Sequence, residues 1–240
     1  MQQAGRWGNT LAAVESGQSF MDMLCRSATV NYCSGGGEIF CAKGCSSCCT
    51  LAVNCSAAEA FLVGKALDKR QQKNLTGYVE KLTGVVGKAV DMKDYLRLHR
   101  KELGGCPFLE DGICGIYSVR PISCRALLAT KESRWCGVDF SELASAEKLA
   151  FVESLDRTAA AFPMHYLACT QDTGQKLEAQ LSLQMLKEYG YSLCGSMPVL
   201  VYLFTEYDLY NRLGNGADNV LAAAAAAGLT NPFLLQIETL

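Results

Sequence analysis

The sequence predicts a mostly α fold, in which a helical domain surrounds an irregular, loop-rich cysteine cluster with at most a small β-hairpin. Apolar residues recur every three or four positions over several stretches, which places them on one face of a helix. A helix-capping motif precedes one of these stretches, and strand patterns are weak outside one short segment. At 240 residues, the chain is long enough to bury a sizeable core without disulfides or metals.

The N-terminal region is expected to contain a first helix, a break and then a capped second helix. Residues 10–28 carry apolar side chains at loosely helical intervals, and Gly35-Gly36-Gly37 then interrupts the chain. Ser56 and Glu59 have the spacing of a capping box, in which each side chain satisfies a free backbone donor at a helix start. We therefore expect a helix from this box to about Leu67.

The central region is expected to hold amphipathic helices, a hairpin and a further helix start. Between Leu75 and Leu98 the apolar spacing predicts one or two helices, which the Gly104-Gly105 pair ends. Asp111-Gly112 favours a tight turn between two short strands. Pro121 suits the first turn of a helix because proline lacks only a donor that is free there. This start places Cys124 near a helix N-terminus, where the dipole favours a thiolate.

The rest of the chain is expected to be helical, with Gly or Pro near several breaks. The expected helices span residues 141–162, 173–189, 197–213 and 218–227. Along the chain we expect three parts: an N-terminal helix and lead-in (1–37), a cysteine-cluster metal-binding domain (38–137) and a helical C-terminal region (138–240).

Composition argues against several classes of function. The formal net charge is -2, with 22 basic and 24 acidic residues, so the sequence lacks the basic excess typical of nucleic-acid binding. No apolar run reaches the roughly 20 residues needed to span a bilayer, so no membrane association is expected. The 13 cysteines are an odd number for a disulfide scaffold. Because the N-terminus shows no signal-peptide pattern, we expect a cytoplasmic protein with free thiols.

Four cysteines lie within one short stretch, at Cys41, Cys45, Cys48 and Cys49. Thiolates repel one another, so such a density indicates a metal ion or cluster that holds them deprotonated. The Cys-x3-Cys-x2-Cys spacing puts three thiols on a loop with Gly44, which suits three corners of an iron–sulfur cubane. Adjacent side chains usually point apart, so Cys48 and Cys49 favour two sites over chelation of one ion.

Further cysteines are expected to complete the site, namely Cys106, Cys114, Cys124 and Cys136. The predicted hairpin joins the first two, the third lies at a predicted helix start, and the fourth follows along the chain. Together with the first four they supply eight thiols, enough for two four-thiolate sites, each either a tetrahedral zinc or a cubane.

These residues resemble a known family, the bacterial cysteine-cluster proteins of the YkgJ type, described as a zinc- or iron-chelating domain. The resemblance covers roughly residues 38–137, and its elements are Cys41-x3-Cys45-x2-Cys48-Cys49, Cys106-Pro107-Phe108-Leu109, Cys114, Tyr117 and Arg120-Pro121-Ile122-Ser123-Cys124-Arg125. It implies metal binding by these cysteines without a settled activity. A related cysteine cluster in flagellin lysine methylases looks like an iron–sulfur site.

The expected cofactor is an iron–sulfur cluster, with 4Fe-4S favoured and two clusters allowed, in a structural, electron-transfer or sensing role. Zinc accepts the same four thiols, so a zinc-binding or zinc-chelating protein is the alternative. The spacing also occurs in radical S-adenosylmethionine enzymes, although Ser47 stands where an aromatic is usual there. A cluster-dependent methyltransferase or radical enzyme is the second alternative. A protein redox partner fits the electron-transfer role, and the sequence does not define the oligomeric state.

Residues near the cysteines receive more ordinary interpretations. His99 is expected on a solvated helix face, and His165 is four residues from Cys169, a weak metal-binding pair. Arg120 and Arg125 are expected to support the site by offsetting the charge of the cluster, and Tyr117 by forming an aromatic lid that excludes water. The sequence favours packing over ligation for the remaining thiols, Cys25, Cys33, Cys55, Cys169 and Cys194.

Overall fold

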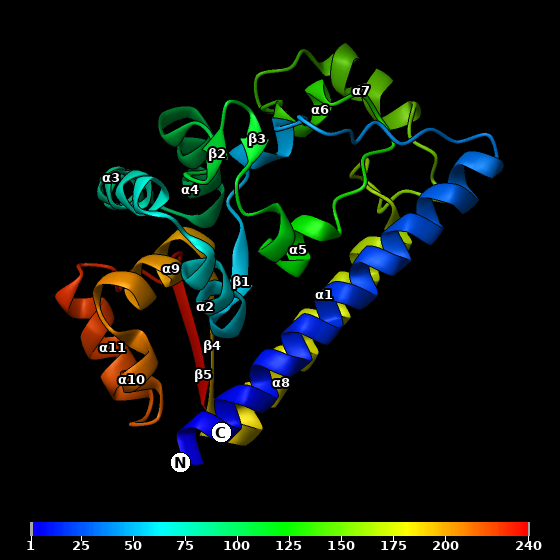
Figure 1. Ribbon diagram of the computed structural model, residues 1–240. Helices are drawn as coiled ribbons and strands as arrows, with labels where there is room; N and C mark the ends of the chain where they lie inside the picture. Colours follow the sequence, from blue (N-terminus) through cyan, green and yellow to red (C-terminus); the bar gives the residue numbers. More distant parts are fainter. Residues whose placement is uncertain (1, 240) are drawn as a thin grey trace.

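A computed structural model describes residues 2–239 of the chain, with side chains from residue 5 onward. It confirms a mostly α fold. Two long helices, α1 (Gln2–Ser34) and α8 (Ala168–Tyr189), pack against each other along one side of the molecule (Figure 1). The first ends directly before the predicted glycine break, and the second ends at Gly190, whose positive φ of 78° suits glycine.

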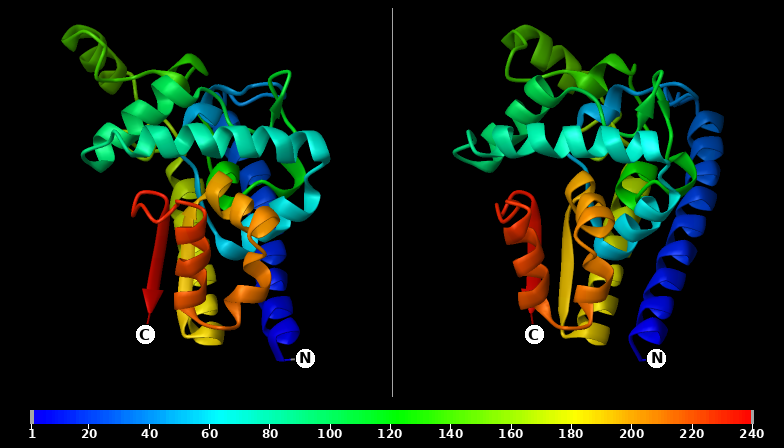
Figure 2. Two further views of the ribbon diagram at one scale, coloured as in Figure 1. Left: turned by 90° about the vertical axis from the view of Figure 1, so that its left-hand side faces the viewer. Right: turned by 60° about the vertical axis from the view of Figure 1, so that its left-hand side comes forward.

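The capping box is confirmed at the start of α2 (Ala57–Ala66), where Glu59 accepts a 2.9 Å hydrogen bond from the Ser56 amide. The amphipathic region forms α3 (Lys69–Val86) and α4 (Met92–Leu98), followed by a π-helical turn at His99–Leu103. Helix α3 crosses the ends of the C-terminal helices and packs on α9 (Met197–Glu206) (Figure 2).

The predicted hairpin is confirmed as β2 (Leu109–Glu110) and β3 (Ile113–Cys114). Its two turn residues, Asp111 and Gly112, have φ values of 50° and 78°. Positive φ at both central residues defines a type I′ turn, which matches the twist of the strands that it joins.

A three-stranded antiparallel sheet was not indicated by the sequence. Its middle strand β4 (Tyr191–Ser196) pairs with β1 (Asn54–Ser56) on one side and β5 (Leu235–Thr239) on the other. Five of the six residues of β4 are buried, so its two faces do not differ in exposure, which is the difference that a strand pattern in the sequence depends on. The partner strands are only three and five residues long, too short for a clear pattern.

The second half is less continuously helical than expected. The expected helix 141–162 is limited to α7 (Ser145–Glu153), and irregular backbone leads from there to α8. The expected helix 197–213 divides into α9 and α10 (Leu209–Leu213), because Asp208 adopts a left-handed conformation with φ 51°. The other short helical elements are η1 (Ser47–Thr50), η3 (Tyr117–Val119), α5 (Ile122–Arg125), α6 (Arg134–Gly137) and α11 (Ala217–Ala226).

The main core draws apolar side chains from both halves of the chain, including Val14 of α1, Leu82 of α3 and Leu200 of α9. A smaller cluster lies apart from it and contains Ala129, Cys136 and Tyr166. Over residues 2–239, none of the helices has the length and apolar character needed to cross a membrane.

Candidate metal centre

All eight cysteines proposed from the sequence line one cavity of about 590 Å³. They come from four segments of the chain: the loop 41–49 with η1, the hairpin 106–114, α5 and α6. Helix η1 packs against α6 and against the π-helical turn. The structure thus gathers residues that are almost a hundred positions apart in sequence.

The loop that carries Cys41 and Cys45 is shaped by a glycine and by hydrogen bonds to the backbone of Ala129. Gly44 has φ 86°, a left-handed conformation that favours glycine. The Ala129 amide donates to Cys41 Sγ at 3.2 Å, and the Phe40 amide donates to the Ala129 carbonyl at 2.9 Å. These two contacts place the first thiol of the motif at the cavity wall.

Cys48 and Cys49 share the short helix η1, and their side chains do not point apart as expected. A hydrogen bond between the two thiols lowers the pKa of Cys48 to about 7 and raises that of Cys49. The Cys49 carbonyl also accepts a 2.9 Å hydrogen bond from the Cys106 amide. A single turn of 3-10 helix therefore brings both thiols to the same cavity and joins it to the hairpin.

The eight thiols fall into two neighbourhoods. Burial raises the pKa of Cys136 to about 11, and the nearby thiols of Cys48, Cys41 and Cys45 raise it further. We name this set group A: Cys41, Cys45, Cys48 and Cys136. Burial also raises the pKa of Cys106, to about 12, with Cys114 and Cys48 adding to the effect.

The second neighbourhood is group B, which contains Cys49, Cys106, Cys114 and Cys124. Cys49 is assigned to it because the thiols of Cys106 and Cys114 lie near enough to raise its pKa. Burial holds the pKa of Cys124 well above its usual range, and the thiols of Cys106, Cys48 and Cys114 raise it further. Cys48 therefore lies between the two groups. Because the buried thiols favour their protonated form, a metal that binds here must displace protons.

One cation, Arg120, lies among the thiols and lowers the pKa of several of them, including Cys48 and Cys114. Its guanidinium carbon is 4.1 Å from the centre of the Tyr117 ring, a cation–π contact. Its Nε is buried without a hydrogen-bond partner. Tyr117 lines the cavity and is 61% exposed.

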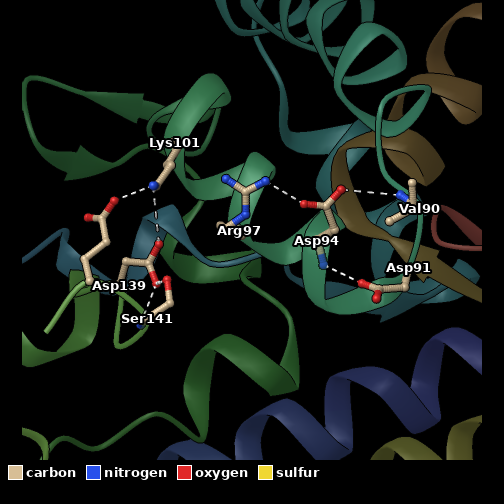
Figure 3. A network of polar contacts seen from close by, with 8 residues as sticks. Val90, Asp91, Asp94, Arg97, Lys101, Asp139 and Ser141 are labelled. Carbon is tan, nitrogen blue, oxygen red and sulfur yellow. Dashed lines mark hydrogen bonds and ion pairs between the residues drawn. The ribbon is translucent and has the colours of Figure 1, made fainter. Parts of the chain in front are cut away.

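The segment after Cys136 is tied to the π-helical turn. Arg100 donates a hydrogen bond to the Val138 carbonyl, and Lys101 forms an ion pair with Glu142. Lys101 also forms an ion pair of 3.9 Å with Asp139 (Figure 3). The turn thereby anchors the end of α6, the helix that carries the last thiol of group A.

Within residues 5–239, no three side chains of His, Cys, Asp or Glu are already gathered in an arrangement that would hold a metal ion. The donor chemistry of the cavity nevertheless fits a thiophilic metal, since eight thiols face it. Zinc and iron–sulfur clusters both take all-thiolate ligation, whereas hard cations such as Mg²⁺ prefer oxygen.

The sequence interpretation of His99 was wrong. Its side chain is 4% exposed and lines the cavity, with Nε2 3.0 Å from Tyr78 Oη. Burial lowers the pKa of His99 to about 4. The neighbouring Arg97, Arg100 and Lys101 suggested a solvated face, but the residue begins the π-helical turn, whose wider backbone the sequence does not reveal.

His165 also differs from expectation. It does not share a helix face with Cys169, because α8 begins only at Ala168 and Cys169 is exposed. Its Nε2 lies instead 3.2 Å from the Sγ of Cys136 in the small buried cluster. No sequence pattern joins residues 29 positions apart across irregular backbone.

The remaining cysteines lie outside the cavity lining. All 13 cysteines of the chain are free thiols. Cys55 is buried as expected, and Cys25 and Cys194 are half-buried. The expectation of core packing was wrong for Cys33 and Cys169, which are both exposed.

A fold of helices around a thiol-lined cavity defines a cysteine-rich protein of the metal-chelating class. Residues 40–145 match the family model CxxCxxCC, described as "Putative zinc- or iron-chelating domain". This match agrees with the resemblance seen in the sequence, and the matched segment contains all eight cavity cysteines. No curated protein and no solved structure matches the chain.

Proposed function

We propose that the protein holds iron–sulfur clusters through the eight cavity cysteines, with one 4Fe-4S cluster for each group of four. The observation that carries this proposal is the convergence of eight thiols from four segments on one cavity of about 590 Å³. Thiolates are the standard ligands of such clusters. The family description supports metal chelation and names both zinc and iron.

Cavity size favours a cluster over a single ion. A volume of about 590 Å³ lies within the roughly 300–1,000 Å³ of pockets that take small molecules. A structural zinc site encloses one ion at about 2.3 Å from each sulfur and leaves no such space. A cubane binds one thiolate on each of its irons, so its four ligands surround a cluster of atoms that needs more space than a single zinc ion.

The number of thiols and their two neighbourhoods support two clusters, and the proposal assigns Cys48 and Cys49 to different groups. Consecutive residues bring one thiol to group A and one to group B, and each group then needs three thiols from other positions. Arg120 offsets part of the negative charge that the thiolates and clusters bring to this half-buried place. We further propose a structural, electron-transfer or sensing role in the cytoplasm, with a protein redox partner for electron transfer.

Anaerobic purification followed by metal and sulfide analysis tests the proposal. We expect brown protein with visible charge-transfer absorption and about eight irons and eight acid-labile sulfides per chain if each group holds a cubane. Colourless protein that contains stoichiometric zinc would contradict the cluster proposal and indicate two zinc sites instead. Protein that takes up neither metal after reconstitution would contradict metal binding altogether.

Single Cys-to-Ser variants then test the division into groups. We expect Cys45→Ser to lose the group A cluster and keep the group B cluster, and Cys114→Ser to show the reverse. Cys33→Ser and Cys169→Ser are matched controls because both thiols are exposed and outside the cavity lining. Full metal loss in a control with retention in Cys45→Ser would overturn the ligand set.

A further inference from the structure

The sulfur of Cys136 has two polar side-chain neighbours, and both come from outside the family-matched segment. His165 Nε2 is 3.2 Å away, and the Tyr166 hydroxyl forms a hydrogen bond with the same thiol that lowers its pKa. Both residues are buried, with exposed fractions of 4% and 6%. The family model ends at residue 145, so these contacts belong to this chain's own C-terminal region.

Several hydrogen bonds hold His165 in place without using its imidazole ring. The amide and the hydroxyl of Thr130 both donate to the His165 carbonyl, at 2.8 and 2.9 Å. The ring packs edge-on against Phe151 at 5.8 Å between centroids. The backbone is therefore anchored by Thr130 while Nε2 is free to face Cys136.

The same segment also supports the other end of group A. The backbone of Tyr166 pairs with that of Ala129, and the Leu167 amide donates to the Leu128 carbonyl at 3.0 Å. Ala129 in turn donates to Cys41 Sγ at 3.2 Å. A continuous set of backbone contacts thus runs from the residues before α8 to the first cysteine of the motif.

From this geometry we propose that His165 is a positioning residue for Cys136, whose sulfur it holds as a metal-binding thiolate by donating the Nε2 hydrogen. The inference rests on the proposed function, because it takes Cys136 as a ligand of group A. The thiol proton leaves to solvent as the metal–sulfur bond forms, and the imidazole keeps its own proton.

The proposal follows from the cost of a buried charge. A thiolate in an apolar cluster is unfavourable unless a donor or cation faces it. Tyr166 supplies one such donor, and the proposal assigns the other to the Nε2–H tautomer of His165, whose Nε2 is 3.2 Å from the sulfur. Donors in the outer shell fix the orientation of a ligand, and their removal typically weakens metal binding by about 10–100-fold.

Two variants of His165 separate positioning from simple packing. His165→Phe keeps a ring for contact with Phe151 and removes the donor, whereas His165→Gln keeps an N–H donor. In a Zn²⁺ titration against a competing chelator, we expect His165→Phe to weaken the group A site by about 10–100-fold. We expect His165→Gln to restore most of the affinity, and circular dichroism monitors the fold of both.

A double-mutant cycle with Cys136→Ser provides the sharper result. If His165 acts through the Cys136 sulfur, His165→Phe has no further effect on Zn²⁺ affinity once that sulfur is absent. Equal losses in both backgrounds, or wild-type affinity in His165→Phe, would overturn the inference and leave metal binding intact. Absence of Zn²⁺ binding, and of cluster reconstitution, in the wild type would instead refute the proposed function and this inference with it.

A measurement on the unaltered protein covers the case in which His165→Phe does not fold. With ¹⁵N-labelled histidine, the Nε2 resonance of His165 is expected to shift on Zn²⁺ addition. Its chemical shift should remain that of a nitrogen that carries a hydrogen. The chain has two histidines, so the resonance that is missing from the spectrum of His165→Gln identifies His165. An unshifted His165 resonance upon full Zn²⁺ binding contradicts the proposal.

Discussion

The carboxylate of Glu59 accepts a 2.8 Å hydrogen bond from the backbone amide of Ile122, which is 63 residues away along the chain. Glu59 is fully buried, and its other oxygen accepts from the amide and the hydroxyl of Ser56. One side chain therefore caps α2 and the first turn of α5, the helix that carries Cys124. A capping box that is local in sequence thereby holds part of the metal centre.

Replacing Glu59 by alanine is expected to lower the free energy of unfolding by about 2–4 kcal/mol, because it leaves the amides of half-buried Ser56 and buried Ile122 without acceptors. Urea unfolding monitored by circular dichroism measures the change. Glu147→Ala is the matched control, since Glu147 accepts a similar hydrogen bond from Ala144 at an exposed helix start. Equal effects of the two substitutions would contradict the role of Glu59 in joining α2 to α5.

The ion pair between Arg125 and Asp22 is expected to contribute more than a surface pair. The Arg125 side chain is 3% exposed, and its Nη1 lies 2.5 Å from Asp22 Oδ2 on α1. Asp22→Asn leaves the guanidinium buried without its counter-charge, so we expect a loss of about 1–3 kcal/mol in unfolding free energy. Thermal and urea unfolding at low salt check this value.

A matched control for that pair is Asp94→Asn, because Asp94 and Arg97 form an ion pair of 2.6 Å that faces solvent (Figure 3). Solvent and salt screen such pairs, so we expect a clearly smaller change than for Asp22→Asn. A larger effect at the Asp94 pair would show that burial of Arg125 does not determine the strength of its ion pair.

Stability is expected to depend on pH through Glu178 of α8. Burial, with a smaller effect of the nearby Glu59, raises its pKa from 4.5 to about 7. A raised carboxyl pKa means that the folded protein binds the proton more tightly, so its contribution is full below about pH 4.5 and is lost as pH rises through 7. Allowing for partial exposure, we expect the loss to be about 1–3 kcal/mol.

The variant Glu178→Gln isolates this effect. Its unfolding free energy, relative to wild type, is expected to increase between pH 5 and pH 8, because only the wild type acquires a poorly solvated charge. Urea unfolding at the two pH values measures the difference. A constant difference between the two proteins would show that Glu178 does not titrate in this range.

Metal removal is expected to loosen the cavity region and leave the long helices intact. Where ligands come from loops, the free energy of metal binding is also free energy of folding. Hydrogen exchange before and after chelation should therefore increase at residues 40–50 and 106–137, with little change in α1 and α8. Equal increases throughout the chain would indicate that the metal supports the whole fold instead.

The cavity cysteines were accessible to sequence reasoning because their pattern is local. Cys41 to Cys49 cluster within one loop, and the hairpin turn at Asp111-Gly112 requires only the preferences of two adjacent residues. The Ser56–Glu59 box is similarly short-ranged. The proposed part boundaries after residues 37 and 137 remain predictions, and the assignment of each thiol as a ligand awaits the metal analysis.

Other features depend on segments that meet only when the chain folds. Cys136 meets His165 across 29 residues, His99 turns inward through a π-helical turn, and β4 pairs with strands too short to show a pattern. By itself, the sequence determined the helical class, the hairpin and the set of thiols, since spacing along the chain controls local backbone geometry. Only the tertiary structure decided that those thiols share one cavity and that His165 contacts the sulfur of Cys136, because packing of distant segments sets these contacts.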